Sequence, residues 1–198
     1  MSAPFVLGLT GSIGMGKSTT AGLLAQAGLA VWDADAAVHR LYAPGGAAVF
    51  AVARRFPAAL KDGGIDRKAL KAEIARDSRA LADLEAIVHP LVAADRQRFL
   101  DTPASDILVL DVPLLFESGA NALCDATLLV TAPPELQRAR VMARPDITEE
   151  TFRLILSRQM PDAEKRARAT HVLETLSLDL ARAYVKALLA YIRESRDA

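Results

Sequence analysis

Short apolar runs alternate along the chain with longer segments in which apolar residues recur at helical spacing. The runs cover residues 5–9, 29–32, 107–111, 126–131 and 171–173. A strand that is apolar at consecutive positions is typical of a parallel sheet, because both of its faces are buried. Strands that alternate with helices favour the α/β class. We therefore predict a three-layer α/β/α fold around a five-stranded parallel sheet.

Capping residues and helix breakers mark the helices that connect these strands. The first predicted helix runs from Lys17 to about Ala27 and is ended by Gly28. Ser177 is expected to cap a final amphipathic helix. Other helical segments are expected at 35–42, at 133–143 and, rich in charge, at 148–168. The apolar face of the final helix would consist of Leu180, Tyr184, Leu188 and Tyr191 or Ile192.

The middle of the chain, residues 44–101, is more charged and contains no run typical of a strand. Residues 62–64, Asp-Gly-Gly, predict a turn. Asp66 and Ser78 are suitable N-caps for two helices, and Pro90 is expected to start or kink the continuation of the second. We therefore predict a helical insert between the second and third strands.

Composition narrows the class of protein. The 198 residues fit one domain with elaborations, and 24 basic residues balance 24 acidic ones, which argues against a general nucleic-acid binder. Aromatic residues make up 5% of the chain, too few for a base-stacking platform. A single cysteine, Cys124, favours a reducing compartment, and no apolar stretch approaches the ~18 residues of a membrane span. We expect a cytoplasmic protein that binds neither nucleic acid nor membranes.

A glycine-rich segment lies between the first predicted strand and the first predicted helix. Its sequence is Gly11-Ser12-Ile13-Gly14-Met15-Gly16-Lys17-Ser18-Thr19, which matches the P-loop pattern in full. Glycines let backbone amides turn toward phosphate oxygens, and the helix N-terminus adds partial positive charge. Lys17 is expected to reach the β- and γ-phosphates, and Ser18 to offer its hydroxyl oxygen to Mg²⁺. The segment predicts a kinase that uses ATP and Mg²⁺.

Aspartates follow two of the predicted strands: Asp33 and Asp35 follow the second, and Asp111 ends the third. Ligands of open α/β sheets bind at the carboxyl ends of the strands. A kinase that acts on an alcohol uses a carboxylate to orient the hydroxyl group and accept its proton. We expect one of Asp33 and Asp35 to do this and the other to cap the following helix. Two alternatives stay open for Asp111, a carboxylate near Mg²⁺ or an ordinary strand end.

Several motifs, taken together, are more specific than the P-loop alone. They are Thr10 with the P-loop, Asp33-Ala34-Asp35 with His39, Gly64 to Leu70, Leu84 to Pro90, Pro113-Leu114-Leu115-Phe116-Glu117, and Gln137, Arg140 or Arg144, and Gln159 in order. In this combination the chain resembles the dephospho-CoA kinase family over about residues 5–173. The resemblance implies ATP-dependent phosphorylation of the ribose 3′-hydroxyl of dephospho-CoA, the last step of coenzyme A synthesis.

The resemblance also implies a P-loop kinase fold in three parts. The nucleotide-binding core would cover about residues 1–43, 102–136 and 169–198. A CoA-binding helical insert would cover about 44–101, and a mobile lid about 137–168. All three parts would belong to one domain that works as a monomer or a small homo-oligomer.

Specific roles follow from the resemblance as well. Asp35 would be the general base for the 3′-hydroxyl, and Arg140 and Arg144 would approach the phosphates from the lid. The acceptor side would be lined by Thr10, Asp33, His89, Leu114, Leu115 and Phe116.

The chain departs from the family pattern in two places. Ser12 and Met15 replace smaller residues, but both stand at variable positions of the P-loop. Residues 169–177, Ala-Thr-His-Val-Leu-Glu-Thr-Leu-Ser, lack the aspartate, asparagine and glycine that the family has there. This second departure leaves the contacts on the adenine side open.

Two other functions are compatible with the P-loop. Another small-molecule kinase, such as a nucleoside monophosphate kinase, would share the loop and the lid but differ in its acceptor pocket. A nucleotide switch would bind without transferring phosphate. A guanine-specific switch needs an Asn-Lys-x-Asp segment, whereas Asn121 is followed by Ala122.

Overall fold

The computed structural model describes residues 3–145 and 147–197 of the chain. It divides the chain into two compact units. The first, here called the core unit, comprises Met1–Val31 and Pro103–Ala198. The second, the helical unit, comprises Trp32–Thr102.

The core unit is built around a parallel β-sheet. The strands are β1 (Phe5–Thr10), β2 (Ala30–Asp33), β5 (Ile107–Asp111), β6 (Ala126–Thr131) and β7 (His171–Glu174). Within the described residues they form a five-stranded sheet in the order β2-β5-β1-β6-β7. β1 runs parallel to both β5 and β6, and β6 runs parallel to β7. The predicted α/β class and its five-stranded parallel sheet are confirmed.

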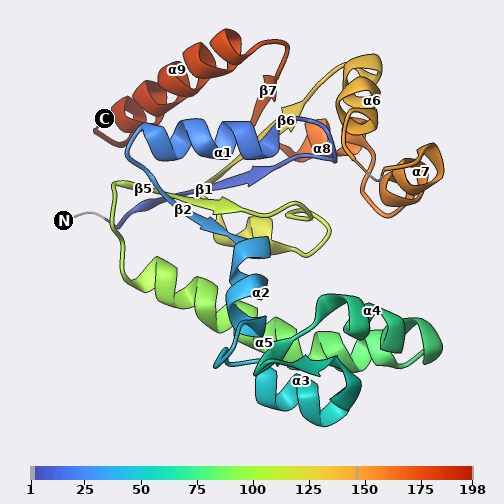
Figure 1. Ribbon diagram of the computed structural model, residues 1–198. Coiled ribbons are helices and arrows are strands. Elements are labelled where there is room, and N and C mark those ends of the chain that lie inside the picture. The colour runs from blue at the N-terminus through green and yellow to red at the C-terminus, as the bar shows by residue number, and fades with distance from the viewer. Residues whose placement is uncertain (1–2, 146, 198) are drawn as a thin grey trace. The chain divides into compact units, whose positions relative to one another are not determined.

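Two helices, α1 (Lys17–Gln26) and α9 (Leu178–Asp197), cover one face of this sheet (Figure 1). Alternate residues of the strands point toward them, as the two-residue period of a strand requires. Leu7, Leu9 and Val109, all fully buried, belong to this cluster. Gly28, with φ +88°, follows α1, so the predicted glycine stop is confirmed.

The buried face of α9 matches the predicted one at Tyr184, Leu188 and Ile192 but not at Leu180. Leu180 is 55% exposed, although it was expected to face the core, and of the alternatives Tyr191 and Ile192 it is Ile192 that is buried. The residues of α9 that join the core are Ala181, Val185, Leu188, Leu189 and Ile192. The helix packs against α1.

Shorter α-helices in the described part of the core unit are α6 (Pro134–Met142), α7 (Glu149–Ser157) and α8 (Asp162–Arg168). The single charged segment expected at 148–168 is thus two helices, because Pro161 interrupts it and directly precedes α8. Ser177 accepts a hydrogen bond from the Leu180 amide at 3.2 Å, which confirms the predicted cap of α9.

The helical unit contains α2 (Ala34–Tyr42), α3 (Val49–Arg55), α4 (Arg67–Arg76) and α5 (Ala80–Asp101). Its core gathers buried residues from these helices, among them Leu41, Tyr42, Val52, Phe56, Leu70 and Val88. Because α2 packs against α5, the unit begins at Trp32, whereas the insert was expected to begin at 44.

Local details of the helical unit correct two further expectations. A small hairpin, β3 (Leu60–Lys61) with β4 (Gly64–Ile65), lies where no strand was expected. Asp62 and Gly63 both have positive φ, 50° and 77°, as a two-residue hairpin turn requires. Strands of two residues are too short to show any periodicity in the sequence.

The second correction concerns the start of α5. Asp66 caps α4 through its carboxylate, as predicted. Arg79, and not Ser78, occupies the N-cap position of α5, and the Asp77 carboxylate accepts the Arg79 N–H at 2.9 Å. Pro90 lies inside α5, which continues past it.

Among residues 3–145 and 147–197, no helix is both long and apolar enough to cross a membrane.

Candidate functional site

The glycine-rich loop connects the end of β1 to the start of α1, as the sequence predicts. Gly14 and Gly16 have φ of +78° and +89°, a region that only glycine enters without strain. A Cβ on Gly14 would also lie 2.6 Å from Val141 Cγ2 of α6. Both the conformation and the packing of the loop therefore depend on these glycines.

The N-terminus of α1 provides a site for an anion. Its first turn is Lys-Ser-Thr-Thr, without a carboxylate, so the backbone N–H groups and the helix dipole are not neutralised there. Ser18 and Thr19 are exposed at this end. The local chemistry suits phosphate groups.

Lys17 forms an ion pair with Asp111 at the end of β5. Lys17 Nζ lies 2.5 Å from Asp111 Oδ1, and the Asp111 side chain is 2% exposed. The pair forms because β5 runs parallel beside β1, with Asp111 opposite Leu9 in the register. A carboxylate here and the exposed hydroxyl of Ser18 are hard oxygen donors of the kind that Mg²⁺ prefers. These residues therefore fit the magnesium ion that the P-loop implies.

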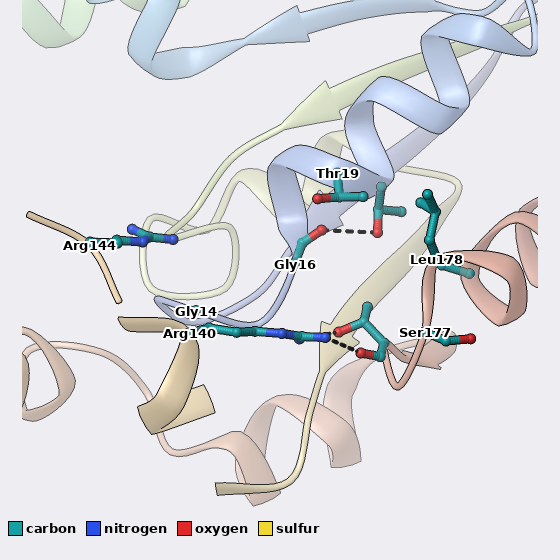
Figure 2. A pocket seen from close by; sticks show the side chains of 10 residues that line it. Gly14, Gly16, Thr19, Arg140, Arg144, Ser177 and Leu178 are labelled. Carbon is teal, nitrogen blue, oxygen red and sulfur yellow. Dashed lines mark hydrogen bonds between the residues drawn. The ribbon is translucent and has the colours of Figure 1, made fainter. Parts of the chain in front are cut away.

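A pocket of about 450 Å³ adjoins the loop (Figure 2). Arg140 and Arg144 line it, together with residues of the P-loop and of the segment that leads into α9. The remaining lining residues are Gly14, Gly16, Thr19, Thr20, Thr175, Ser177, Leu178 and Ala181. The pocket combines two arginines with apolar surface, which suits a nucleoside beside the phosphate loop.

Thr175 joins three parts of this pocket. Its hydroxyl donates to the Met15 carbonyl of the P-loop at 2.8 Å. The Arg140 guanidinium donates to the same hydroxyl at 2.8 Å and to the Thr175 carbonyl at 2.5 Å (Figure 2). Arg140 is thus held against the loop after β7. Thr175 lies in the segment that departs from the family pattern, and sequence reasoning assigned it no role.

Glu117, the last residue of the Pro113-to-Glu117 motif, contacts the end of the predicted lid. Its carboxylate accepts the Met160 N–H at 2.9 Å and lies 3.0 Å from Lys165 Nζ, which is fully buried. Among the described residues Nζ makes no well-directed hydrogen bond, so the contact is mainly electrostatic. Burial raises the pKa of Glu117, but the Met160 N–H and Lys165 outweigh it and hold that pKa below its ordinary value.

The other predicted residues of the core unit differ in exposure. Thr10 is fully buried, and its hydroxyl donates to the Pro113 carbonyl at 3.0 Å. Leu115 is fully buried and packs beside Gly8, and Phe116 is 7% exposed. Leu114 is 42% exposed. Of Leu114, Leu115 and Phe116, Leu114 is therefore the residue most available to a ligand.

The predicted residues of the helical unit lie on α2 and α5. Asp33 is the N-cap of α2 and accepts the Ala36 N–H at 2.8 Å. Asp35 lies in the first turn of the same helix and is exposed. His89 is exposed on α5. Of the two aspartates, Asp33 thus performs the capping that the sequence assigned to one of them.

Comparisons with known proteins show the family of the chain. The profile of the family described as dephospho-CoA kinase (CoaE) matches residues 5–178. A dephospho-CoA kinase of Cereibacter sphaeroides is 67% identical over 195 residues, which cover 98% of this chain and 99% of that protein.

Two solved structures are similar to this chain over nearly its whole length. TT1252 from Thermus thermophilus has 41% identity and a TM-score of 0.82, over 96% of this chain and 98% of that one. Dephospho-CoA kinase from Campylobacter jejuni has 22% identity and a TM-score of 0.67 over the same shares, a likeness in fold. The family that the sequence motifs indicated is confirmed, and the chain belongs to the dephospho-CoA kinase family.

Proposed function

We propose that this chain transfers the γ-phosphoryl group of ATP to the ribose 3′-hydroxyl of dephospho-CoA, which yields coenzyme A, ADP and a proton. The observation that carries the proposal is a complete P-loop, with its lysine held by a strand-end aspartate, in a chain of this family. The family match supports dephospho-CoA as the acceptor, and the P-loop supports phosphoryl transfer from ATP.

The nucleotide would bind entirely within the core unit. The phosphates would lie along residues 11–19, where amide groups and the N-terminus of α1 attract anions. The base and ribose would occupy the pocket of about 450 Å³ beside Arg140. A guanidinium fixed by two hydrogen bonds to Thr175 offers a flat cation on which a purine can stack.

Phosphoryl transfer needs positioning and charge neutralisation more than covalent chemistry. Lys17 would leave Asp111 for the β- and γ-phosphate oxygens, and Arg144 would approach the same charge from the lid. Magnesium, held by Ser18 and a strand-end carboxylate, would neutralise the phosphates and fix their geometry. Asp35 would accept the proton of the 3′-hydroxyl as its oxygen bonds to the γ-phosphorus and the bond to the ADP oxygen breaks.

The substrate and metal also define the setting that we propose. The enzyme would work in the cytoplasm with ATP and Mg²⁺, as a monomer or a small homo-oligomer. Closure of residues 137–168 over the bound nucleotide would exclude water and limit wasteful hydrolysis of ATP.

Product identification tests the proposal. The protein is incubated with ATP, Mg²⁺ and dephospho-CoA, and in parallel with nucleoside monophosphates, and the products are identified by mass spectrometry. We expect coenzyme A and ADP in the first mixture and no phosphorylated product in the others. Phosphorylation of a nucleoside monophosphate but not of dephospho-CoA would assign the chain to the alternative kinase class.

A further inference from the structure

Ile13, in the middle of the P-loop, has both of its backbone polar groups bound by glutamine side chains. Its N–H donates to Gln159 Oε1 at 3.2 Å. Its carbonyl accepts a hydrogen bond from Gln137 Nε2 at 2.7 Å. Gln137 lies on α6 and is 6% exposed, and Gln159 follows α7. Two elements far along the chain thus hold one residue of the loop.

The direction of each hydrogen bond is fixed by the backbone. Only the amide nitrogen of a glutamine can donate to a carbonyl, and only its oxygen can accept from an N–H. Gln137 must therefore present its nitrogen to Ile13, and Gln159 must present its oxygen. The two side chains are of the same type, but Gln137 acts as a hydrogen-bond donor and Gln159 as an acceptor.

The bond from Gln137 also sets the direction of the next amide. A trans peptide is planar, so the Ile13 carbonyl and the Gly14 N–H point in opposite directions. Because the carbonyl points to Gln137 on α6, the Gly14 N–H points away from α6. Gly14 has a φ of +78° and no side chain that could restrict the orientation of this peptide plane. The orientation therefore depends on the hydrogen bonds that neighbouring residues make to the peptide.

We propose that Gln137 and Gln159 are positioning residues that hold the Ile13–Gly14 peptide with its N–H turned toward the phosphates of the nucleotide. The inference rests on the proposed function, because it assigns these side chains to the same phosphate site. Gln137 acts as the donor of this clamp and Gln159 as the acceptor. Gln137 and Gln159 contact Ile13 without a nucleotide, so these two positions preorganise the loop before ATP binds, and the proposed closure concerns the residues between them.

Glutamate substitutions separate the two roles, because a carboxylate accepts hydrogen bonds but does not donate them. Gln137→Glu removes the required donor and places two oxygens against each other. Gln159→Glu keeps an acceptor for the Ile13 N–H. Gln26→Glu, at an exposed position of α1, is the matched control for the change of charge. Dissociation constants for Mg²⁺–ATP and for dephospho-CoA are measured by calorimetry for all three and for the wild type.

We expect Q137E to weaken Mg²⁺–ATP binding about tenfold or more, since a buried carbonyl is left without its donor. Q159E should weaken it by no more than about threefold, and Q26E should match the wild type. The affinity for dephospho-CoA should be the same in all four proteins. Melting temperatures show whether each variant is folded at the assay temperature.

The pH dependence gives a readout that loss of packing alone would not move. A protonated carboxyl group can donate, so the ATP defect of Q137E relative to Q26E should shrink between about pH 8 and about pH 5.5. If Q137E does not fold, Gln137→Met, which removes the donor without adding charge, should show the same loss of ATP affinity.

Three results would overturn the clamp: equal losses in Q137E and Q159E, an unaffected Q137E, or a Q137E defect that stays constant with pH. A wild-type chain that binds no ATP would instead remove the proposed function, and the role of the clamp with it. Wild-type affinity together with an unaffected Q137E removes the clamp alone.

Discussion

Lys17 and Thr175, two polar residues at the P-loop, should affect different kinetic parameters when they are replaced. The Lys17 ammonium group can move from Asp111 to phosphate oxygens, whereas the Thr175 hydroxyl connects the Met15 carbonyl of the P-loop with the Arg140 guanidinium. Loss of the charge should act on the transition state, where negative charge develops on the transferred group. Loss of the hydroxyl should act on the shape of the pocket. Kinetic parameters distinguish the two effects.

Lys17→Ala should reduce kcat by about 10²-fold or more, because the β- and γ-phosphate charge loses its main neutralising side chain. The measurement is a coupled assay with saturating ATP and dephospho-CoA, with Lys186→Ala, on α9, as the control. Near-normal turnover of the Lys17 variant would contradict the assigned role of the loop.

Thr175→Val keeps the shape of the side chain but removes the hydroxyl, and with it the hydrogen bond to Met15 and one of the two from Arg140; the bond from Arg140 to the backbone carbonyl remains. We expect the KM for ATP to rise about tenfold while the KM for dephospho-CoA stays unchanged. Thr102→Val, on the helical unit, serves as the control for the same substitution. An unchanged KM for ATP would show that the Thr175 hydroxyl does not support the nucleotide pocket.

His171 predicts a dependence of stability on pH. Burial lowers the pKa of its imidazole below the ordinary value of 6.5. The unfolded chain therefore binds more protons than the folded one between those two pKa values, and the free energy of unfolding rises with pH there. This contribution is complete above about pH 6.5 and is lost as the pH falls through the lowered pKa.

The test is urea unfolding of the wild type and of His171→Asn at about pH 5 and about pH 7.5. The difference in unfolding free energy between the two pH values should be smaller in the variant. An equal difference in both proteins would exclude His171 as a source of the pH dependence.

Element boundaries were predictable where one signal dominates. The strands at 107–111 and 126–131 match the prediction because continuous apolar runs, buried on both faces, have few alternatives. The hairpin β3–β4 was missed because two residues make no period. The face of α9 was predicted only in part, because Ala181 and Val185 join the core whereas Leu180 is exposed.

The residues of the candidate site were predictable where they lie next to one another in the sequence. The P-loop can be read from consecutive residues, and Asp33 and Asp35 from their position after a strand. Thr175, Gln137 and Gln159 contact the loop only because the fold brings distant segments together, 160, 124 and 146 positions away. Sequence motifs placed the two glutamines in a family pattern, but their hydrogen bonds to Ile13 come from the structure.

The start of α2 yields a prediction at the level of one helix. Asp33→Ala removes the N-cap and should lower the free energy of unfolding by about 1 kcal/mol. Asp35→Asn leaves that cap in place and should cost only a few tenths of a kcal/mol, yet abolish most turnover, since an amide cannot accept the hydroxyl proton. Chemical denaturation and steady-state kinetics of both variants check the contrast. A stable, fully active Asp35→Asn would exclude it as the general base.

At the scale of the whole molecule, the proposed nucleotide site lies within the core unit, whereas Asp35, the proposed general base, belongs to the helical unit. The core unit combines the P-loop, the Lys17–Asp111 pair and the pocket beside Arg140. The family match over residues 5–178 includes residues of both units. Nucleotide binding and proton acceptance are thus assigned to different compact units of the chain.

A crystal structure with Mg²⁺, a non-hydrolysable ATP analogue and dephospho-CoA tests this account most directly. We predict the triphosphate along residues 11–19, the base beside Arg140, and the Asp35 carboxylate within hydrogen-bond distance of the ribose 3′-hydroxyl. A nucleotide bound elsewhere, with the glycine-rich loop unoccupied, would contradict it.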